Sequence, residues 1–296
     1  MNLERWLLAV SVSAALFAEN SFAAQGDPVA GYKLLTTIGL PGGLSANDIA
    51  WADPGAARLY LADRGNASAT PPIAPRIDVI DTVTNRFLTS IALPSATNGV
   101  VGLPRRHEVW TGLNDSTVNV INTDTNTIVA VINTGGTGRA DEVAYDPVDH
   151  LILIANDRDQ PAFVSFIDTE TRTVVKRLVY DGTSAPNATG GIEQPVWDPQ
   201  ANKFYISIPA TGANPKGEVD ELDPLWLSVT RSFPTTCGPA GLALLPAQRL
   251  ITSCGDVIDI LSAKILTTVK GSAETRSGTT RSISACTSAA ARTGSA

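Results

Sequence analysis

Residues 108–123 read EVWTGLNDSTVNVINT, and this stretch decides the fold. Val, Ile, Trp and Thr favour strands, and the central Asn114-Asp115-Ser116 is typical of a turn. Residues 127–132 then alternate apolar and polar side chains, which predicts a further strand with one exposed face. The stretch therefore predicts an antiparallel meander of short strands.

The same pattern recurs along the chain. Each copy has a strand, a turn that carries proline, a second strand, and a third strand that ends in Asp or Asn. The turn prolines are Pro54, Pro104, Pro147, Pro199 and Pro246. Their spacing of roughly 40 to 50 residues is the length of one four-stranded blade. The sequence therefore predicts an all-β propeller of four-stranded blades, with about five repeats between residues 32 and 271.

The first part of this region, Tyr32–Leu40, matches an outer strand but has no inner strands before it. In a closed propeller, such an orphan strand completes the last blade, whose other three strands should stand at the end of the chain. The strand pattern stops after Gly271 without such a set, so we expect an incomplete ring of six or seven blades.

The alternation ends after Gly271, where Ser, Thr, Ala and Arg predominate. Residues 272–296 are therefore predicted to be an aberrant or disordered tail. A frameshift, real or from sequencing, is a sharper hypothesis. Codons for Arg276–Arg281, when read one base earlier, permit Glu, Ile or Val, Trp, Tyr, Asn and Pro, which would repeat the pattern of Asp141–Pro147.

Residues 108–128 resemble a repeat of the YVTN family of β-propellers, and a weaker likeness extends over about residues 44–270. The resemblance implies the propeller fold. It says little about function, because such relatives include exported binding and surface proteins and propeller parts of larger enzymes.

The N-terminus has the features of an export signal. Arg5 precedes an apolar run from Trp6 to Phe17, and small residues follow at Ser21 and Ala23. The run is shorter than the roughly 20 residues that a membrane-spanning helix needs. We therefore predict a cleaved signal peptide over residues 1–23, a periplasmic or extracellular location, and no membrane span.

The net charge of -7 and the lack of a basic stripe argue against binding to nucleic acid. We expect a monomer that binds a protein or a small molecule. Three cysteines in an exported chain invite pairing. Cys237 and Cys254 bracket a hairpin pattern and are predicted to form a disulfide, which leaves Cys286 unpaired.

No catalytic motif was found for a covalent haem, a serine nucleophile, a zinc protease or a phosphate-binding loop. The two histidines, His107 and His150, fall in predicted turns, where solvated side chains are the ordinary case. The aromatic residues Trp51, Trp110, Tyr145 and Trp197 lie at repeat positions that are expected to pack between blades.

Acidic and amide residues recur where innermost strands begin and where second strands end. Antiparallel geometry brings both positions to one face, at the mouth of the central channel. The predicted ligand-binding residues are Asp48, Asp141, Glu142, Glu193, Asn114, Asn156 and Asp157. Oxygen ligands suit calcium, and Asp48, Glu142 and Glu193 are the predicted metal ligands. The same residue types are also ordinary at turns.

Two functions remain open at this stage. The favoured one is a non-enzymatic binding or scaffold protein that recognises its ligand at the channel face. The alternative is a hydrolase that resembles calcium-dependent lactonases of the gluconolactonase kind, for which Glu193, Asp48, Asn156 and Asp157 are candidates. No cofactor other than calcium is suggested.

Overall fold

A computed structural model describes residues 34–182 and 186–269. The chain divides into two compact units, Met1–Thr37 and Ile38–Ala296. In the first unit only residues 34–37 are described, and they have no regular secondary structure. The strands and the candidate site all belong to the second unit.

Five four-stranded antiparallel sheets make up the described part of this unit. The first holds β1 (Asn47–Asp53), β2 (Arg58–Asp63), β3 (Arg76–Asp81) and β4 (Arg86–Ala92). The second holds β5 (Thr97–Leu103), β6 (Glu108–Leu113), β7 (Thr117–Asn122) and β8 (Thr127–Asn133), with a 3-10 turn η1 (Pro104–Arg106) between β5 and β6. The third holds β9 (Val143–Asp146), β10 (Leu151–Asn156), β11 (Ala162–Asp168) and β12 (Thr173–Tyr180). The fourth holds β13 (Pro195–Asp198), β14 (Lys203–Ile208), β15 (Glu218–Asp223) and β16 (Ser228–Pro234). The fifth holds β17 (Leu242–Leu245), β18 (Arg249–Thr252), β19 (Asp256–Asp259) and β20 (Lys264–Thr268).

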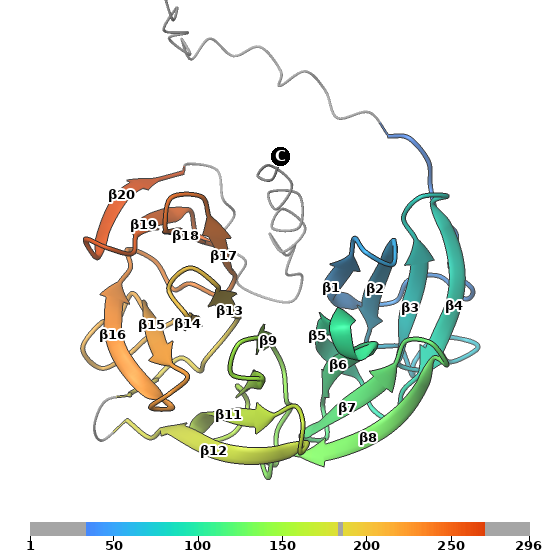
Figure 1. The fold of residues 1–296 in the computed structure, drawn as a ribbon, viewed down its shortest axis with the longest axis horizontal. Helices are drawn as coiled ribbons and strands as arrows, with labels where there is room; N and C mark the ends of the chain where they lie inside the picture. Colours follow the sequence, from blue (N-terminus) through green and yellow to red (C-terminus); the bar gives the residue numbers. More distant parts are fainter. Residues whose placement is uncertain (1–33, 183–185, 270–296) are drawn as a thin grey trace, which may run out of the picture. The chain divides into compact units, whose positions relative to one another are not determined.

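The strands of each sheet pair in chain order, as a meander does. The first strands of successive sheets contact one another, from β1 through β5, β9 and β13 to β17. The sheets are therefore the blades of an incomplete β-propeller with their first strands innermost, which Figure 1 shows and which confirms the predicted fold class.

Burial explains the two kinds of strand in the sequence. β6 and β10 are buried along their whole length, because neighbouring blades cover both of their faces. The outer strand β4 instead alternates exposed and less exposed residues. The turns before the outer strands form as predicted; for example, Oδ1 of Asp81 accepts hydrogen bonds from the backbone N–H groups of Val83 and Thr84 at 2.9 and 2.8 Å.

Aromatic side chains pack between blades, as predicted. A Cβ atom on Gly102 of β5 would lie 2.1 Å from the ring of Trp51 in β1, so the ring requires glycine beneath it. Trp110 is fully buried in a core cluster that includes Ile152 and Ile154 of the third blade. These contacts join the first blade to the second and the second blade to the third.

The prediction of an outer strand over 32–40 differs from the structure. Residues 34–40 form no strand. A strand needs a partner for its backbone groups, and each of the five described sheets already has its fourth strand, including β20 in the last.

Two predicted segments lie outside the described residues. The signal peptide (1–23) and the tail (272–296), with its frameshift hypothesis and Cys286, therefore remain predictions. Among residues 34–182 and 186–269, no helix combines the length and the apolar character that crossing a bilayer requires.

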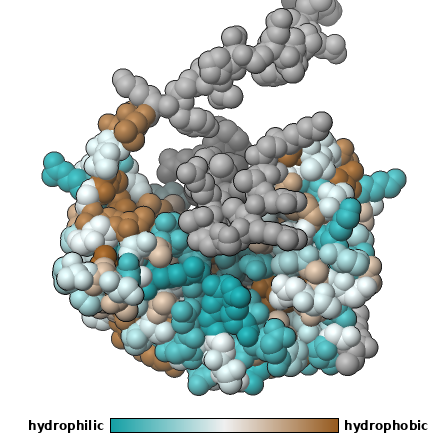
Figure 2. Space-filling view, turned by 180° about the vertical axis from the view of Figure 1, so that it is seen from behind, coloured by the Kyte–Doolittle hydropathy of each residue, from teal (hydrophilic) through white to brown (hydrophobic). Residues whose placement is uncertain are grey.

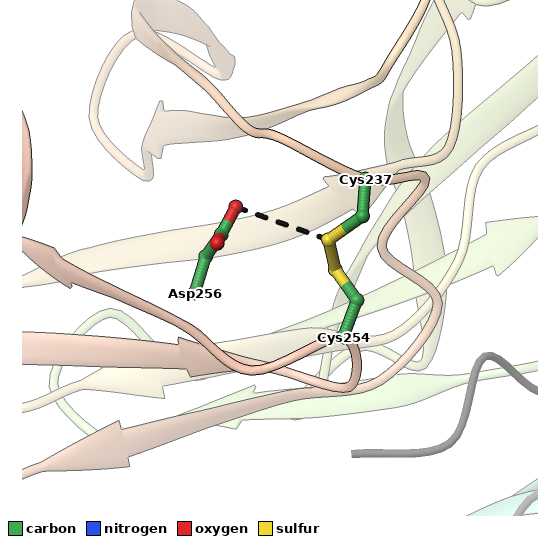
Figure 3. Close-up of side chains that lie close together, drawn as sticks. All are labelled: Cys237, Cys254 and Asp256. Atoms are coloured by element: carbon green, nitrogen blue, oxygen red, sulfur yellow. Dashed lines mark hydrogen bonds between the residues drawn. A yellow bond between two sulfur atoms is a disulfide. The ribbon is translucent and has the colours of Figure 1, made fainter. Parts of the chain in front are cut away.

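A disulfide joins Cys237, in the connection that leads to β17, with Cys254, in the turn before β19 (Figure 3). Their Cα atoms are 6.2 Å apart, within the usual range for a disulfide. Oδ2 of Asp256 lies 3.8 Å from Sγ of Cys237. These three residues are close enough to hold a metal ion. However, sulfur atoms bonded to each other are not thiolate ligands.

Replacing Cys237 and Cys254 together by serine is expected to destabilise the last blade. The disulfide closes a loop of 17 residues. A loop of this size is worth about 3 kcal/mol in the chain-entropy account. Urea unfolding of oxidised wild type and of the double variant measures the difference. Reduced wild type should behave like the double variant, and equal midpoints for all three proteins would contradict the prediction.

Candidate functional site

One side of the blades carries the connections that enter β1, β5 and β9 and the turns that leave β2, β6 and β10. Pairing in the sheet sets this arrangement, because Asn47 at the start of β1 lies opposite Asp63 at the end of β2. In the second blade, the side-chain Nδ2 of Asn98 donates to Oδ1 of Asn114 at 3.0 Å. Residues far apart in sequence thus meet near the innermost strands, at the predicted channel mouth.

Three carboxylates from the first and third blades converge there. Ligand atoms of Asp48, Asp141 and Glu142 all lie within 4.8 Å of one another, and the three residues are buried. In the described part of the chain, neither Oδ1 of Asp141 nor Oε2 of Glu142 has a hydrogen-bond partner. Buried oxygens without partners are unfavourable for stability.

Arginines pair with two of these three carboxylates. Nη2 of Arg64 makes an ion pair with Asp48. Nη2 of Arg139 lies 2.6 Å from Oδ2 of Asp141. Arg139 also forms a two-pronged pair with Asp157, in which Nε and Nη2 donate at 2.9 and 2.7 Å. The channel mouth is therefore an ionic network and not a ring of carboxylates alone.

Burial and crowding of like charges shift the ionisation of this network. Burial raises the pKa of Asp141, and the nearby charge of Asp157 raises it further. The pKa of Glu142 is raised by burial and then by Asp141. Burial alone would lower the pKa of Arg139, but its hydrogen bond to Asp157 and the charge of Asp141 outweigh this and raise it.

The other predicted site residues differ in burial and in their distance from the carboxylate cluster. Asn114 is exposed at the mouth, whereas Asn156 is fully buried and donates to Ser116 Oγ and Thr134 Oγ1 at 2.9 Å each. The predicted metal ligands are Asp48, Glu142 and Glu193. In the structure, the carboxylates that lie within 4.8 Å of one another are those of Asp48, Glu142 and Asp141, and Glu193 is outside this group. The charges of Asp157 and Arg139 nevertheless act on Glu193.

A cavity of about 370 Å³ opens at this mouth, lined by Arg64, Asn114, Arg139 and Arg158. Sequence reasoning singled out the acidic residues and overlooked the three arginines. A signal was present, because Arg64 directly follows Asp63 and Arg158 directly follows Asp157 at the ends of second strands.

The opposite ends of the strands carry both histidines. His107 and His150 lie in the turns after β5 and β9, as predicted, and Nδ1 of His107 lies 3.1 Å from Oδ1 of Asp124 with both side chains exposed. A second cavity of about 480 Å³ includes His107, Tyr60 and Asp124 in its lining.

On the face that Figure 2 presents, a continuous hydrophilic patch lies towards the middle.

We expect Glu193 to make stability depend on pH. Burial, and then the charge of Asp157, raise its pKa from the ordinary 4.5 to about 7. A carboxyl with a raised folded-state pKa favours folding at low pH, and this contribution is lost as the pH rises from about 4.5 through 7. Relative to Glu193→Gln, wild type should therefore lose roughly 2–3 kcal/mol across this window.

Urea unfolding of both proteins at pH 4.5, 6 and 8 checks this expectation. The difference between them should grow with pH. A constant difference would show that Glu193 is solvated with an ordinary pKa. Glu170→Gln, at an exposed turn residue, is the matched control.

Comparisons with known proteins support the fold. No protein-family model and no curated protein matches the chain. A solved chain of Kuenenia stuttgartiensis hydrazine synthase matches with a TM-score of 0.57 and 17% identity. The match covers 71% of this chain and 64% of that chain, less than two-thirds of its length. At this identity the likeness shows the fold alone.

Proposed function

We propose that this chain is an exported, YVTN-type β-propeller binding protein whose ligand, a protein or a small molecule, binds at the channel mouth. The observation that carries the proposal is the buried acidic cluster of Asp48, Asp141, Glu142 and Asp157, with Arg64 paired to Asp48 and Arg139 paired to Asp141 and Asp157. Its side chains come from separate blades and meet at one end of the innermost strands. The YVTN-like repeats and the predicted export signal in the sequence support the family type and the location.

The energetics of the network favour a role in binding. Buried ion pairs are seldom more stabilising than well-packed apolar residues, because removing charges from water is costly. Here the network also leaves Oδ1 of Asp141 and Oε2 of Glu142 without partners among the described residues. A site that sacrifices stability in this way, next to a cavity of about 370 Å³, is suited to recognition of a polar ligand.

A blocking variant tests the proposal. Asn114→Trp places a large side chain in the cavity, and Val83→Trp makes a matched change at the exposed turn between β3 and β4. Calorimetric titration with a panel of amino acids, dicarboxylates, sugars and short peptides should find a ligand whose binding Asn114→Trp abolishes and Val83→Trp preserves. Equal binding to both variants, or saturable binding by no member of the panel, would count against the channel mouth.

A calcium-dependent lactonase is the second candidate. The close grouping of Asp48, Asp141 and Glu142 favours it, because their oxygen ligands are of the type that calcium prefers. Two of these oxygens have no hydrogen-bond partner in the described chain, so the donor set fits a cation. Bound calcium would supply a Lewis acid for an ester carbonyl. Glu193, with a pKa of about 7, is suited to accept a proton.

Hydrolysis of a lactone panel, with calcium and with chelator, separates the two candidates. The binding protein should be inactive in both conditions. Turnover that calcium supports and that Glu142→Gln abolishes would favour the enzyme instead. Calcium titration that yields no heat and no change in melting temperature would remove the second candidate.

A further inference from the structure

The cavity at the channel mouth is lined by hydrogen-bond donors, although the chain as a whole is acidic. Three of its four lining residues are arginines, and the fourth is Asn114. Arg64 lies in the turn after β2, Arg139 in the connection that enters the third blade, and Arg158 in the turn after β10. Two blades supply these three cations, and the second blade supplies the amide.

The charges are layered. The side chains of Asp48, Asp141 and Asp157 are only 5%, 3% and 4% exposed. The guanidinium-bearing side chains paired with them are 31% exposed at Arg64, 18% at Arg139 and 70% at Arg158. Three carboxylates thus lie beneath three guanidinium groups, and a molecule in the cavity meets the positive layer first.

The buried layer positions the arginines. Arg139 is held through Nε and Nη2, which donate to the two oxygens of Asp157. Arg158 contacts the same carboxylate, with Nε 3.2 Å from Oδ2 of Asp157. A fixed guanidinium loses little conformational entropy when it binds a ligand, which favours binding.

Donors remain available for a ligand. Hydrogen bonds among the described residues use Nε and Nη2 of Arg64 and of Arg139, so Nη1 of each stays unused. Neither Nη atom of Arg158 makes a hydrogen bond to a described residue. The side-chain oxygen of Asn114 accepts from Asn98, and no residue in the described ranges accepts from its amide N–H groups.

We propose that this cavity binds a small ligand through a carboxylate or phosphate group, which the free N–H groups of Arg64, Arg139 and Arg158 recognise. This inference rests on the proposed binding function and names the ligand's chemistry. Oxyanions match the planar fork of guanidinium, and a cavity of about 370 Å³ suits a compound of metabolite size.

Calorimetric titration of the full chain with three anions, inorganic phosphate, succinate and citrate, tests the proposal. Succinamide is the neutral analogue of succinate, and 1,4-diaminobutane is the cationic probe. At least one anion should bind saturably, and neither non-anionic probe should compete with it. Phosphate and succinate as separate arms decide which oxyanion is preferred. Anions that bind no better than succinamide would overturn the proposal.

Arg158→Gln provides the variant, because this largely exposed side chain can change without disturbing the core. Affinity for the anion should fall about tenfold, and Arg158→Lys should recover only part of it, since lysine lacks the fork. Arg86→Gln, at an exposed residue of β4, is the matched control. An equal effect of Arg158→Gln and Arg86→Gln would show non-specific charge attraction and would refute the site.

The result also separates this inference from the binding function itself. A sugar or a cationic peptide that Asn114→Trp excludes would leave the proposed function in place and refute the oxyanion. Failure of every probe at the channel mouth would refute both.

Discussion

Replacing Arg139 by methionine is expected to lower the free energy of unfolding by about 3–5 kcal/mol at pH 7, the usual cost of leaving a buried charge without its partner. Arg139 contacts Asp157 through two hydrogen bonds of 2.9 and 2.7 Å, and its Nη2 lies 2.6 Å from Asp141. Methionine retains much of the apolar stem but none of the charge. The nearly inaccessible Asp141 would then lose its paired cation, and Asp157 would keep only the more exposed Arg158.

Acid should reduce this effect. Burial, and then the charge of Asp157, raise the pKa of Asp141 well above its ordinary value. Acid therefore removes the charge of Asp141, and the difference between wild type and Arg139→Met should be smaller at pH 4.5 than at pH 7. Urea unfolding at both values measures it. Arg86→Met, on an outer strand, is the control and should stay within about 0.5 kcal/mol of wild type. A similar small change in Arg139→Met would mean that the network is not held tightly.

The architecture was predictable because the sequence pattern of one blade recurs along the chain. A single apolar run such as that in β6 is ambiguous between helix and strand. Five copies with proline or aspartate at the same turn leave the four-stranded meander as the consistent solution. Residues 34–40 show the limit of this reasoning. Their alternation fits a strand, but a sequence pattern cannot supply the partner that a strand needs.

The site was predictable only in part. Strand direction alone indicated that Asp48, Asp141 and Glu142 share one face, and the structure brings them together. The arginines depend on side-chain reach: Arg64 meets a carboxylate 16 residues away, and Arg139 meets one 18 residues away. Periodicity carries no information about such pairs. The net negative charge of the chain therefore gave no indication of a cavity lined with arginines.

Replacing Trp110 by alanine should disrupt the contact between the second and third blades. Trp110 is fully buried, and its cluster includes Ile152 and Ile154 of β10. Its Nε1 donates to Oε2 of Glu108 at 2.9 Å, so the substitution removes a hydrogen bond as well as a large apolar contact. Truncation of a buried tryptophan to alanine costs about 3–5 kcal/mol.

For a domain of this size, such a loss corresponds to a fall in melting temperature of roughly 10 °C. Scanning calorimetry of wild type, Trp110→Ala and Trp226→Ala measures it. Trp226 provides a matched control because the same substitution is made at a side chain that is 72% exposed, in the turn before β16. Trp226→Ala should melt within a degree or two of wild type. If both variants melted alike, Trp110 would not contribute to the contact between the second and third blades. The packing of blades around an axis, inferred from the repeats, would then lose its main support between these two blades.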